Sequence, residues 1–146
     1  MNYFAYGSNL NLKQMAQRCP QSNLVGKASL QGYKIAFTKY SSSWDSGVAD
    51  IIRAADSEVW GLLYEVTEDD LKRLDGYEGH PDYYLRIAIP VVNEQGDSVE
   101  AYTYEVVDKV DFVPPSEEYL GIIKDAAKKF DFPEEYKIQL DQIESK

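Results

Sequence analysis

Tyr3-Phe4-Ala5-Tyr6-Gly7-Ser8-Asn9-Leu10 begins as a short aromatic strand pattern and ends in a cluster of turn-forming residues. Asn11 can then cap a short helix, which Pro20 ends. A turn of this kind can aim successive backbone N–H groups at one point, and the following helix N-terminus adds partial positive charge. A carboxylate or phosphate could therefore bind there. An ordinary strand-to-helix turn is the alternative interpretation.

Beyond this turn, strand patterns outnumber helix patterns. Strands are expected over residues 30–40, 48–53, 58–66, 83–92 and 98–107, with a loop at 41–47 and a hairpin turn at 93–97. Thr67 with Asp70 predicts a capping box for a second short helix, and residues 75–82 are predicted to form a turn-rich loop. Most neighbouring strands are expected to pair antiparallel.

Two helices are expected near the C-terminal end. Ser116 is the predicted cap of the longer one, in which apolar residues recur at steps of three and four up to Phe130, and Pro133 begins a shorter one. Together with the strands, they predict an α+β fold, a curled or closed sheet with helices packed outside it. No repeat or long linker divides the chain, so residues 1–146 are expected to form a single domain.

The composition excludes several classes of function. The chain of 146 residues has one cysteine, Cys19, and one histidine, His80, so neither a disulfide framework nor a cysteine-rich or multi-histidine metal site is expected. We therefore expect no metal or cofactor, and a cytoplasmic location. A net charge of −10 argues against nucleic acid and anionic membranes as partners. No segment reaches the about 18–20 apolar residues of a membrane span, and no basic signal-peptide region opens the chain.

The charge is unevenly distributed along the chain. Residues 94–146 hold 14 acidic and six basic side chains, most simply a solvated acidic face. Residues 1–44 contain no acidic residue. The basic residues of that stretch are Lys13, Arg18, Lys27, Lys34 and Lys39. One interpretation is that the N-terminal third avoids carboxylates because an anion binds there. Composition alone does not decide between this interpretation and that of a simple solvated acidic face at the C-terminal end.

Glu78, between Tyr77 and Gly79, is the second candidate for chemistry. Partial burial among tyrosines would raise its pKa toward neutrality, which suits proton transfer, although a loop glutamate is ordinarily solvated. The third candidate is the number of tyrosines, 12 against five phenylalanines. The tyrosines of the C-terminal half include Tyr77, Tyr83, Tyr84, Tyr102, Tyr104 and Tyr119. Their ordinary role is packing with the hydroxyl at the rim.

The remaining reactive side chains have simpler interpretations. Asp75 and Asp82 are interpreted as turn residues, His80 as an exposed loop residue, and Cys19 as a small buried apolar residue. A serine hydrolase is poorly supported because the segment around Ser8 lacks the second glycine of a nucleophile elbow.

Four segments in the same order together resemble the γ-glutamylcyclotransferase family. Tyr6–Leu10 resembles its signature loop, residues 58–64 its central strand, and residues 74–79 the segment with its essential glutamate. Residues 114–119, the long helix and residues 132–136 resemble the C-terminal part of γ-glutamylcyclotransferase proper. The resemblance implies the family fold, a small mixed β-barrel with outer helices. It also implies an enzyme that releases 5-oxoproline and a free amine from a γ-glutamyl amino acid or a related γ-glutamyl amide.

The resemblance also implies roles for particular residues. Glu78 would be the general acid/base. The substrate would be bound by Tyr6, Gly7, Ser8, Asn9, Leu10, Tyr84 and Tyr119. Tyr104 is a weaker candidate, and the spacing after the glutamate leaves Tyr83 open as an alternative to Tyr84. The substrate's own α-amine is the nucleophile in this reaction, so one glutamate can serve as base and then as acid.

Two matters stay open at the level of sequence. The same pocket could serve a non-catalytic module that binds a small anionic metabolite of the γ-glutamyl type, although a pure anion binder gains nothing from a nearby carboxylate. The expected partner is a small γ-glutamyl molecule, and a homodimer is as compatible with the sequence as a monomer.

Overall fold

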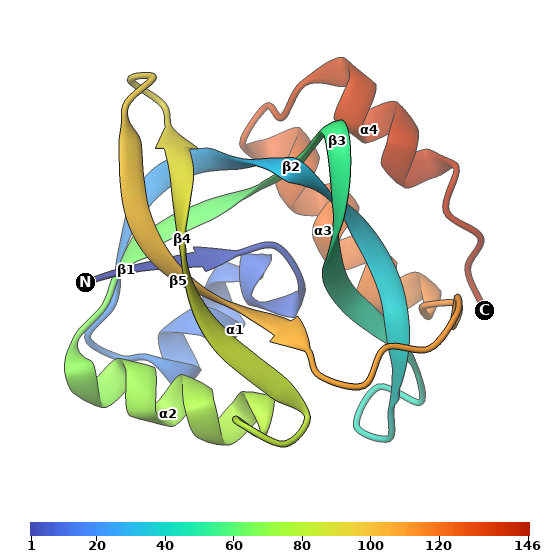
Figure 1. The fold of residues 1–146 in the computed structure, drawn as a ribbon, viewed down its shortest axis with the longest axis horizontal. Coiled ribbons are helices and arrows are strands. Elements are labelled where there is room, and N and C mark those ends of the chain that lie inside the picture. The colour runs from blue at the N-terminus through green and yellow to red at the C-terminus, as the bar shows by residue number, and fades with distance from the viewer.

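The computed structural model describes all residues from Met1 to Lys146 and has a β-barrel with helices on its outside (Figure 1). The elements are β1 (Asn2–Ala5), the 3₁₀ turn η1 (Ser8–Leu10), α1 (Leu12–Arg18), β2 (Asn23–Ser41), β3 (Ser46–Glu65), α2 (Glu68–Glu78), β4 (Tyr84–Asn93), β5 (Ser98–Val106), α3 (Glu117–Lys129) and α4 (Glu134–Asp141). None of these helices combines the length and the apolar character needed to cross a membrane.

The sheet closes on itself in the order β1-β3-β2-β4-β5. The contact between β1 and β5 is parallel, and the other neighbouring strands pair antiparallel. The predicted α+β class, with a mainly antiparallel closed sheet and helices outside it, is confirmed. Because closure leaves no open edge, β1 is hydrogen-bonded on both sides and holds the start of the following turn against the rest of the barrel.

The two central strands are longer than their sequence pattern predicted. β2 already begins at Asn23, and β3 continues through residues 54–57, which we expected to separate two strands. Small and polar residues interrupt the alternation there, and residues 54–57 have no partner in the register with β2, which pairs Tyr33 with Arg53 and then Gln31 with Glu58. Asp56 adopts a positive φ of 66° at this point. Such irregularities increase the local twist, which lets one long strand pair follow the curve of the barrel.

The segment after β3 confirms one prediction and corrects another. Thr67 and Asp70 form the predicted capping box, each side chain accepting a hydrogen bond from the other residue's backbone N–H. Helix α2 then continues to Glu78, so the prediction of a loop from residue 75 was wrong for residues 75–78. The helix ends where Gly79 adopts a left-handed conformation with φ of 67°. Glu78 is therefore held by the last turn of a helix.

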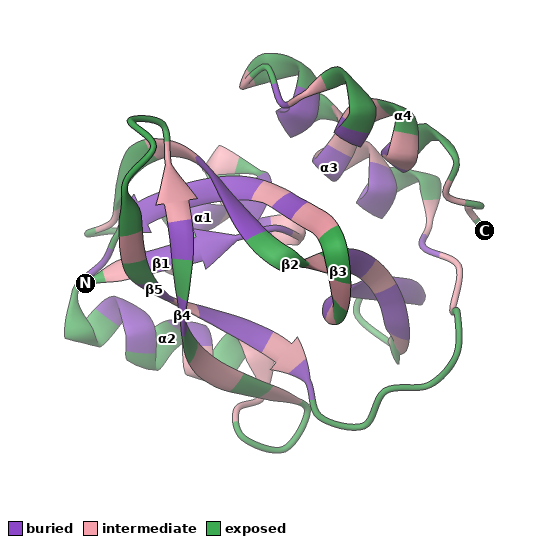
Figure 2. Cartoon of the chain, turned by 45° about the horizontal axis from the view of Figure 1, so that its top comes forward, coloured by how far each residue is buried: buried purple, intermediate pink, exposed green.

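The helices lie on two sides of the barrel, α1 and α2 on one and α3 and α4 on the other (Figures 1 and 2). The predicted caps of α1 and α3 are confirmed, because the side chains of Asn11 and Ser116 accept hydrogen bonds from backbone N–H groups. The buried face of α3 matches its predicted periodicity and comprises Tyr119, Leu120, Ile123, Ala126 and Ala127.

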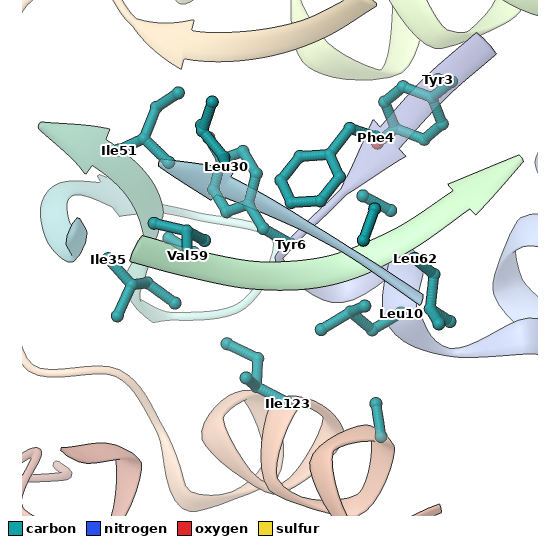
Figure 3. Packing of buried hydrophobic residues seen from close by; sticks show 14 of the residues in the cluster. Tyr3, Phe4, Tyr6, Leu10, Leu30, Ile35, Ile51, Val59, Leu62 and Ile123 are labelled. Carbon is teal, nitrogen blue, oxygen red and sulfur yellow. The ribbon is translucent and has the colours of Figure 1, made fainter. Parts of the chain in front are cut away.

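The core joins the barrel to these helices in one cluster of 33 buried apolar residues. Figure 3 shows Ile123 of α3 facing β3, the strand that carries Val59 and Leu62. Cys19 belongs to the same cluster and is fully buried, as predicted. Since burial of apolar surface is the main stabilising contribution to folding, this shared core fixes α3 against the barrel and with it the position of Tyr119.

Candidate active site

A cavity of about 510 Å³ lies where β1 runs into η1. Its walls come from that turn, the end of α2, the hairpin between β2 and β3, and aromatic side chains of β4, β5 and α3. The lining tyrosines are Tyr3, Tyr6, Tyr40, Tyr77, Tyr83, Tyr84, Tyr104 and Tyr119. Five of the six C-terminal tyrosines noted in the sequence thus reach this cavity, and only Tyr102 does not.

The turn after β1 contributes Gly7, Ser8 and Asn9 to the cavity wall. The N–H groups of Gly7 and Asn9 donate to no protein acceptor, and that of Ser8 faces the Tyr119 hydroxyl. Leu10, expected to bind substrate with them, does not line the cavity. Its side chain is buried in the core, and its N–H donates to the Gly7 carbonyl at 3.0 Å. The 3₁₀ turn thus uses the Leu10 N–H internally, which leaves the other residues of the turn as the better candidates to bind a substrate.

Asn9 holds the turn in place through its buried side chain. Its amide nitrogen donates to the Tyr3 hydroxyl at 2.9 Å, and its oxygen accepts from Gln14 at 3.0 Å and from Arg18 at 3.2 Å. A side chain with these partners has little capacity left for a ligand. Asn9 therefore faces the cavity mainly with its backbone.

Glu78 enters the cavity from the last turn of α2. Its carboxylate has no hydrogen-bond or ion-pair partner in the protein. Burial raises the pKa of Glu78 to about 7, and the nearby positive charge of Arg18 opposes part of this shift. A carboxyl group with this pKa can accept a proton and give it back near neutral pH.

Tyr84 and Tyr119 are fixed by the same backbone unit. The Tyr84 hydroxyl donates to the Ala49 carbonyl at 2.8 Å, and the Ala49 N–H donates to the Tyr119 hydroxyl at 3.0 Å. The ring of Trp44 packs edge-on against Tyr119, with 5.0 Å between the ring centroids. Burial raises the pKa of both tyrosines well above its usual range, so both hydroxyls stay protonated.

Tyr6 and Tyr104 also line the cavity, but their hydroxyls form hydrogen bonds within the protein that hold the cavity wall together. Tyr6 donates to the Tyr104 carbonyl at 2.5 Å, and Tyr104 donates to the Asp75 carboxylate at 2.7 Å. Tyr83, the alternative to Tyr84, lies at the rim with its side chain exposed. The inward position belongs to Tyr84, since its hydroxyl reaches the β3 backbone.

Two residues that we interpreted as exposed or turn residues have structural partners. Asp75 lies within α2, and its carboxylate accepts a hydrogen bond from Arg86 at 2.9 Å in addition to the one from Tyr104. His80 is half-buried, and its Nδ1 accepts the backbone N–H of Arg86 at 3.0 Å. Both residues thus tie the end of α2 to β4. The chain gathers no group of three His, Cys, Asp or Glu side chains that could hold a metal ion.

Comparisons with known proteins agree with this geometry. The family model for γ-glutamyl cyclotransferase, AIG2-like, matches residues 3–121. The γ-glutamylcyclotransferases of Bos taurus and Homo sapiens are each 33% identical over 147 aligned residues, which cover 97% of this chain and 78% of theirs. A solved structure of a γ-glutamyl cyclotransferase superimposes with a TM-score of 0.92 at 31% identity, covering 100% of this chain and 89% of the other.

This chain belongs to the γ-glutamylcyclotransferase family. The relatives that match almost its whole length are enzymes, and the chain is an enzyme of the same family. The motifs that carried the resemblance in the sequence lie within the matched length.

In this member of the γ-glutamylcyclotransferase family, sequence reasoning missed the two cations of the cavity wall, Arg18 and Lys39, and the hairpin at residues 40–44. Arg18 stacks over the Tyr77 ring at 4.6 Å, and Lys39 lies over the Tyr83 ring at 4.7 Å. Neither forms a salt bridge. Both cations lie in the stretch without acidic residues, positions 1–44, for which the sequence suggested anion binding without selecting either of them.

Proposed function

We propose that this enzyme cyclises a γ-glutamyl amide to 5-oxoproline and releases the free amine, with Glu78 as the general acid/base. The observation that carries the proposal is the carboxyl group of Glu78, which has no protein partner, has a pKa of about 7 and faces a tyrosine-lined cavity. Membership of the γ-glutamylcyclotransferase family supports the reaction type.

In the proposed reaction, the neutral α-amine of the γ-glutamyl group attacks its own γ-carbonyl carbon. A new C–N bond closes the five-membered ring, and the bond from the γ-carbon to the leaving nitrogen breaks. One proton moves from the attacking nitrogen to the leaving nitrogen, so Glu78 acts first as base and then as acid. Because the nucleophile is part of the substrate, holding the chain in a curled conformation supplies a large effective concentration.

The turn of Gly7, Ser8 and Asn9 would hold the substrate during this step. Backbone N–H groups without a strong internal acceptor suit a substrate carboxylate, or the oxygen of the γ-carbonyl as it becomes tetrahedral and negative. The tyrosine rings would keep water from the reacting atoms and shape the cavity around the curled chain. Tyr84 and Tyr119, with hydroxyls that bind Ala49, would serve as rigid walls.

The test measures the release of 5-oxoproline from γ-glutamyl-alanine by the wild-type protein and by Glu78→Gln. The substitution keeps the shape of the side chain but removes the proton acceptor, so we expect kcat to fall by about 10²- to 10⁴-fold. Glu65→Gln, which changes an exposed glutamate at the end of β3, is the matched control and should retain activity.

Full activity of Glu78→Gln would refute the role of Glu78. If 5-oxoproline raises the melting temperature of the wild-type protein but no γ-glutamyl compound is turned over, the protein is a binding module instead.

A further inference from the structure

Lys39 lies on the cavity wall at the end of β2 and has no acidic partner. Its ammonium group is 4.7 Å from the centroid of the Tyr83 ring, across the rim of the cavity. The acidic residue of the adjoining hairpin, Asp45, is already engaged by the Tyr40 hydroxyl and by Lys146. Lys39 therefore places a positive charge that no acidic side chain neutralises at the cavity of a chain with a net charge of −10.

The second cation of the cavity, Arg18, lies near the turn and Glu78. Its guanidinium donates to the Asn9 side chain at 3.2 Å and stacks on Tyr77, and its charge opposes the rise in the pKa of Glu78. The two cations are thus attached to different walls, Arg18 beside the general acid/base and Lys39 beside the hairpin.

The chemistry of the reaction indicates which end of the substrate lies at which of these two walls. The attacking α-amine and the α-carboxylate share one carbon atom, so a substrate with its amine at Glu78 has that carboxylate near the turn and Arg18. The leaving group then points toward the rim, where it can depart to solvent. Lys39 of β2 and the exposed Tyr83, which precedes β4, are lining side chains that contact each other there.

We propose that Lys39 is a specificity-determining residue that binds a carboxylate on the leaving group, so that γ-glutamyl compounds with an acidic leaving amine react faster than those with a plain amine. This inference rests on the proposed function. Tyr83 supports the ammonium group through its ring face without neutralising it, which leaves the hydrogen-bond donors of Lys39 free for a carboxylate.

The test compares two substrates that differ only in this carboxylate, γ-glutamyl-alanine and γ-glutamyl-ethylamide. We expect Lys39→Met to lower kcat/KM for γ-glutamyl-alanine about tenfold, the size of one charge-assisted hydrogen bond, and to change that for the ethylamide less than about twofold. The wild-type preference for γ-glutamyl-alanine should disappear in the variant, and Lys39→Arg should restore most of it.

Lys34→Met is the matched control, because it removes the same charge from an exposed position of β2 outside the cavity. It should leave the ratio of the two substrates unchanged. Equal losses for both substrates in Lys39→Met, or equal wild-type rates, would overturn the inference while leaving the cyclisation itself intact. Absence of turnover for both substrates in the wild-type protein would instead overturn the proposed function.

Discussion

A carboxyl group that loses its hydration on folding and gains no partner in exchange becomes a weaker acid. Glu78 is such a group, because it faces the cavity among tyrosine rings and its strongest charged neighbour, Arg18, is shared with Asn9 and Tyr77. The pKa of about 7 is useful for proton transfer, but it has a cost in stability. Functional sites commonly carry such local destabilisation.

The shift predicts how stability depends on pH. The ordinary pKa of a glutamate is 4.5, and that of Glu78 in the folded protein is about 7. The folded state therefore binds this proton more tightly than the unfolded state does. The resulting stabilisation is present below pH 4.5 and is lost as the pH rises through 7. Glu78→Gln stays neutral throughout. We therefore expect it to exceed the wild-type protein in unfolding free energy by about 3 kcal/mol more at pH 8 than at pH 4.5.

Urea unfolding of both proteins at the two pH values measures this difference. A Glu78→Gln effect that is the same at both values would show that the folded-state pKa is not raised. Glu65→Gln, which changes an exposed carboxylate, is the matched control.

Strands β2, β3 and β5 are joined by one buried carboxylate, that of Asp50. Asp50 is fully buried and accepts hydrogen bonds from the Thr38 hydroxyl at 2.6 Å, the Val106 N–H at 2.9 Å and the Lys109 ammonium group at 2.9 Å. The preceding residue, Ala49, binds both Tyr84 and Tyr119. This network therefore fixes the part of β3 that orients two cavity tyrosines.

Removing that carboxylate should weaken the whole barrel. Asp50→Ala leaves a buried N–H, a hydroxyl and the Lys109 charge without their common acceptor, so we expect a loss of about 3 kcal/mol of unfolding free energy. Asp69→Ala, which removes an exposed carboxylate from α2, should cost less than about 1 kcal/mol. Chemical denaturation measures both, and equal small losses would show that the network contributes little.

At the scale of the whole molecule, the C-terminal helices stabilise a site that they only partly form. Phe132 follows α3 and is 1% exposed, with its ring 6.1 Å from that of Trp60 on β3 and 6.0 Å from that of Tyr136 on α4. None of these three aromatic residues lines the cavity. Stability and substrate binding are therefore separable at this contact.

Phe132→Ala should create a void between the helices and the barrel and cost about 3–4 kcal/mol of unfolding free energy. The KM for γ-glutamyl-alanine should stay within about twofold of the wild-type value at temperatures where the variant is folded, because the cavity walls are unchanged. Thermal unfolding and steady-state kinetics on the same preparation test this. A large rise in KM with little loss of stability would mean that the helices control the cavity directly.

Local features of this chain could be predicted because their causes are local. The side chains of Asn11, Thr67 and Ser116 cap helices by accepting hydrogen bonds from N–H groups a few residues away. The turn-forming residues Gly7–Ser8–Asn9 end the strand pattern through their own conformational preferences. The helix end at Gly79 was missed, since a turn-rich sequence does not show whether the preceding residues remain helical. The continuous β3 was missed because residues 54–57 form an unpaired bulge, and only the pairing with β2 on both sides of this bulge joins the two halves into one strand.

The sequence by itself determined the class of fold, the caps and the turn, and family resemblance selected Glu78 as the candidate acid/base. Only the tertiary structure decided which side chains share the cavity, because Arg18, Lys39, Glu78 and Tyr119 meet through barrel closure and helix packing. It also decided the acidity of Glu78, since a pKa depends on the water and charges around the group. Those surroundings come from segments far apart in the chain, so no local pattern contains them.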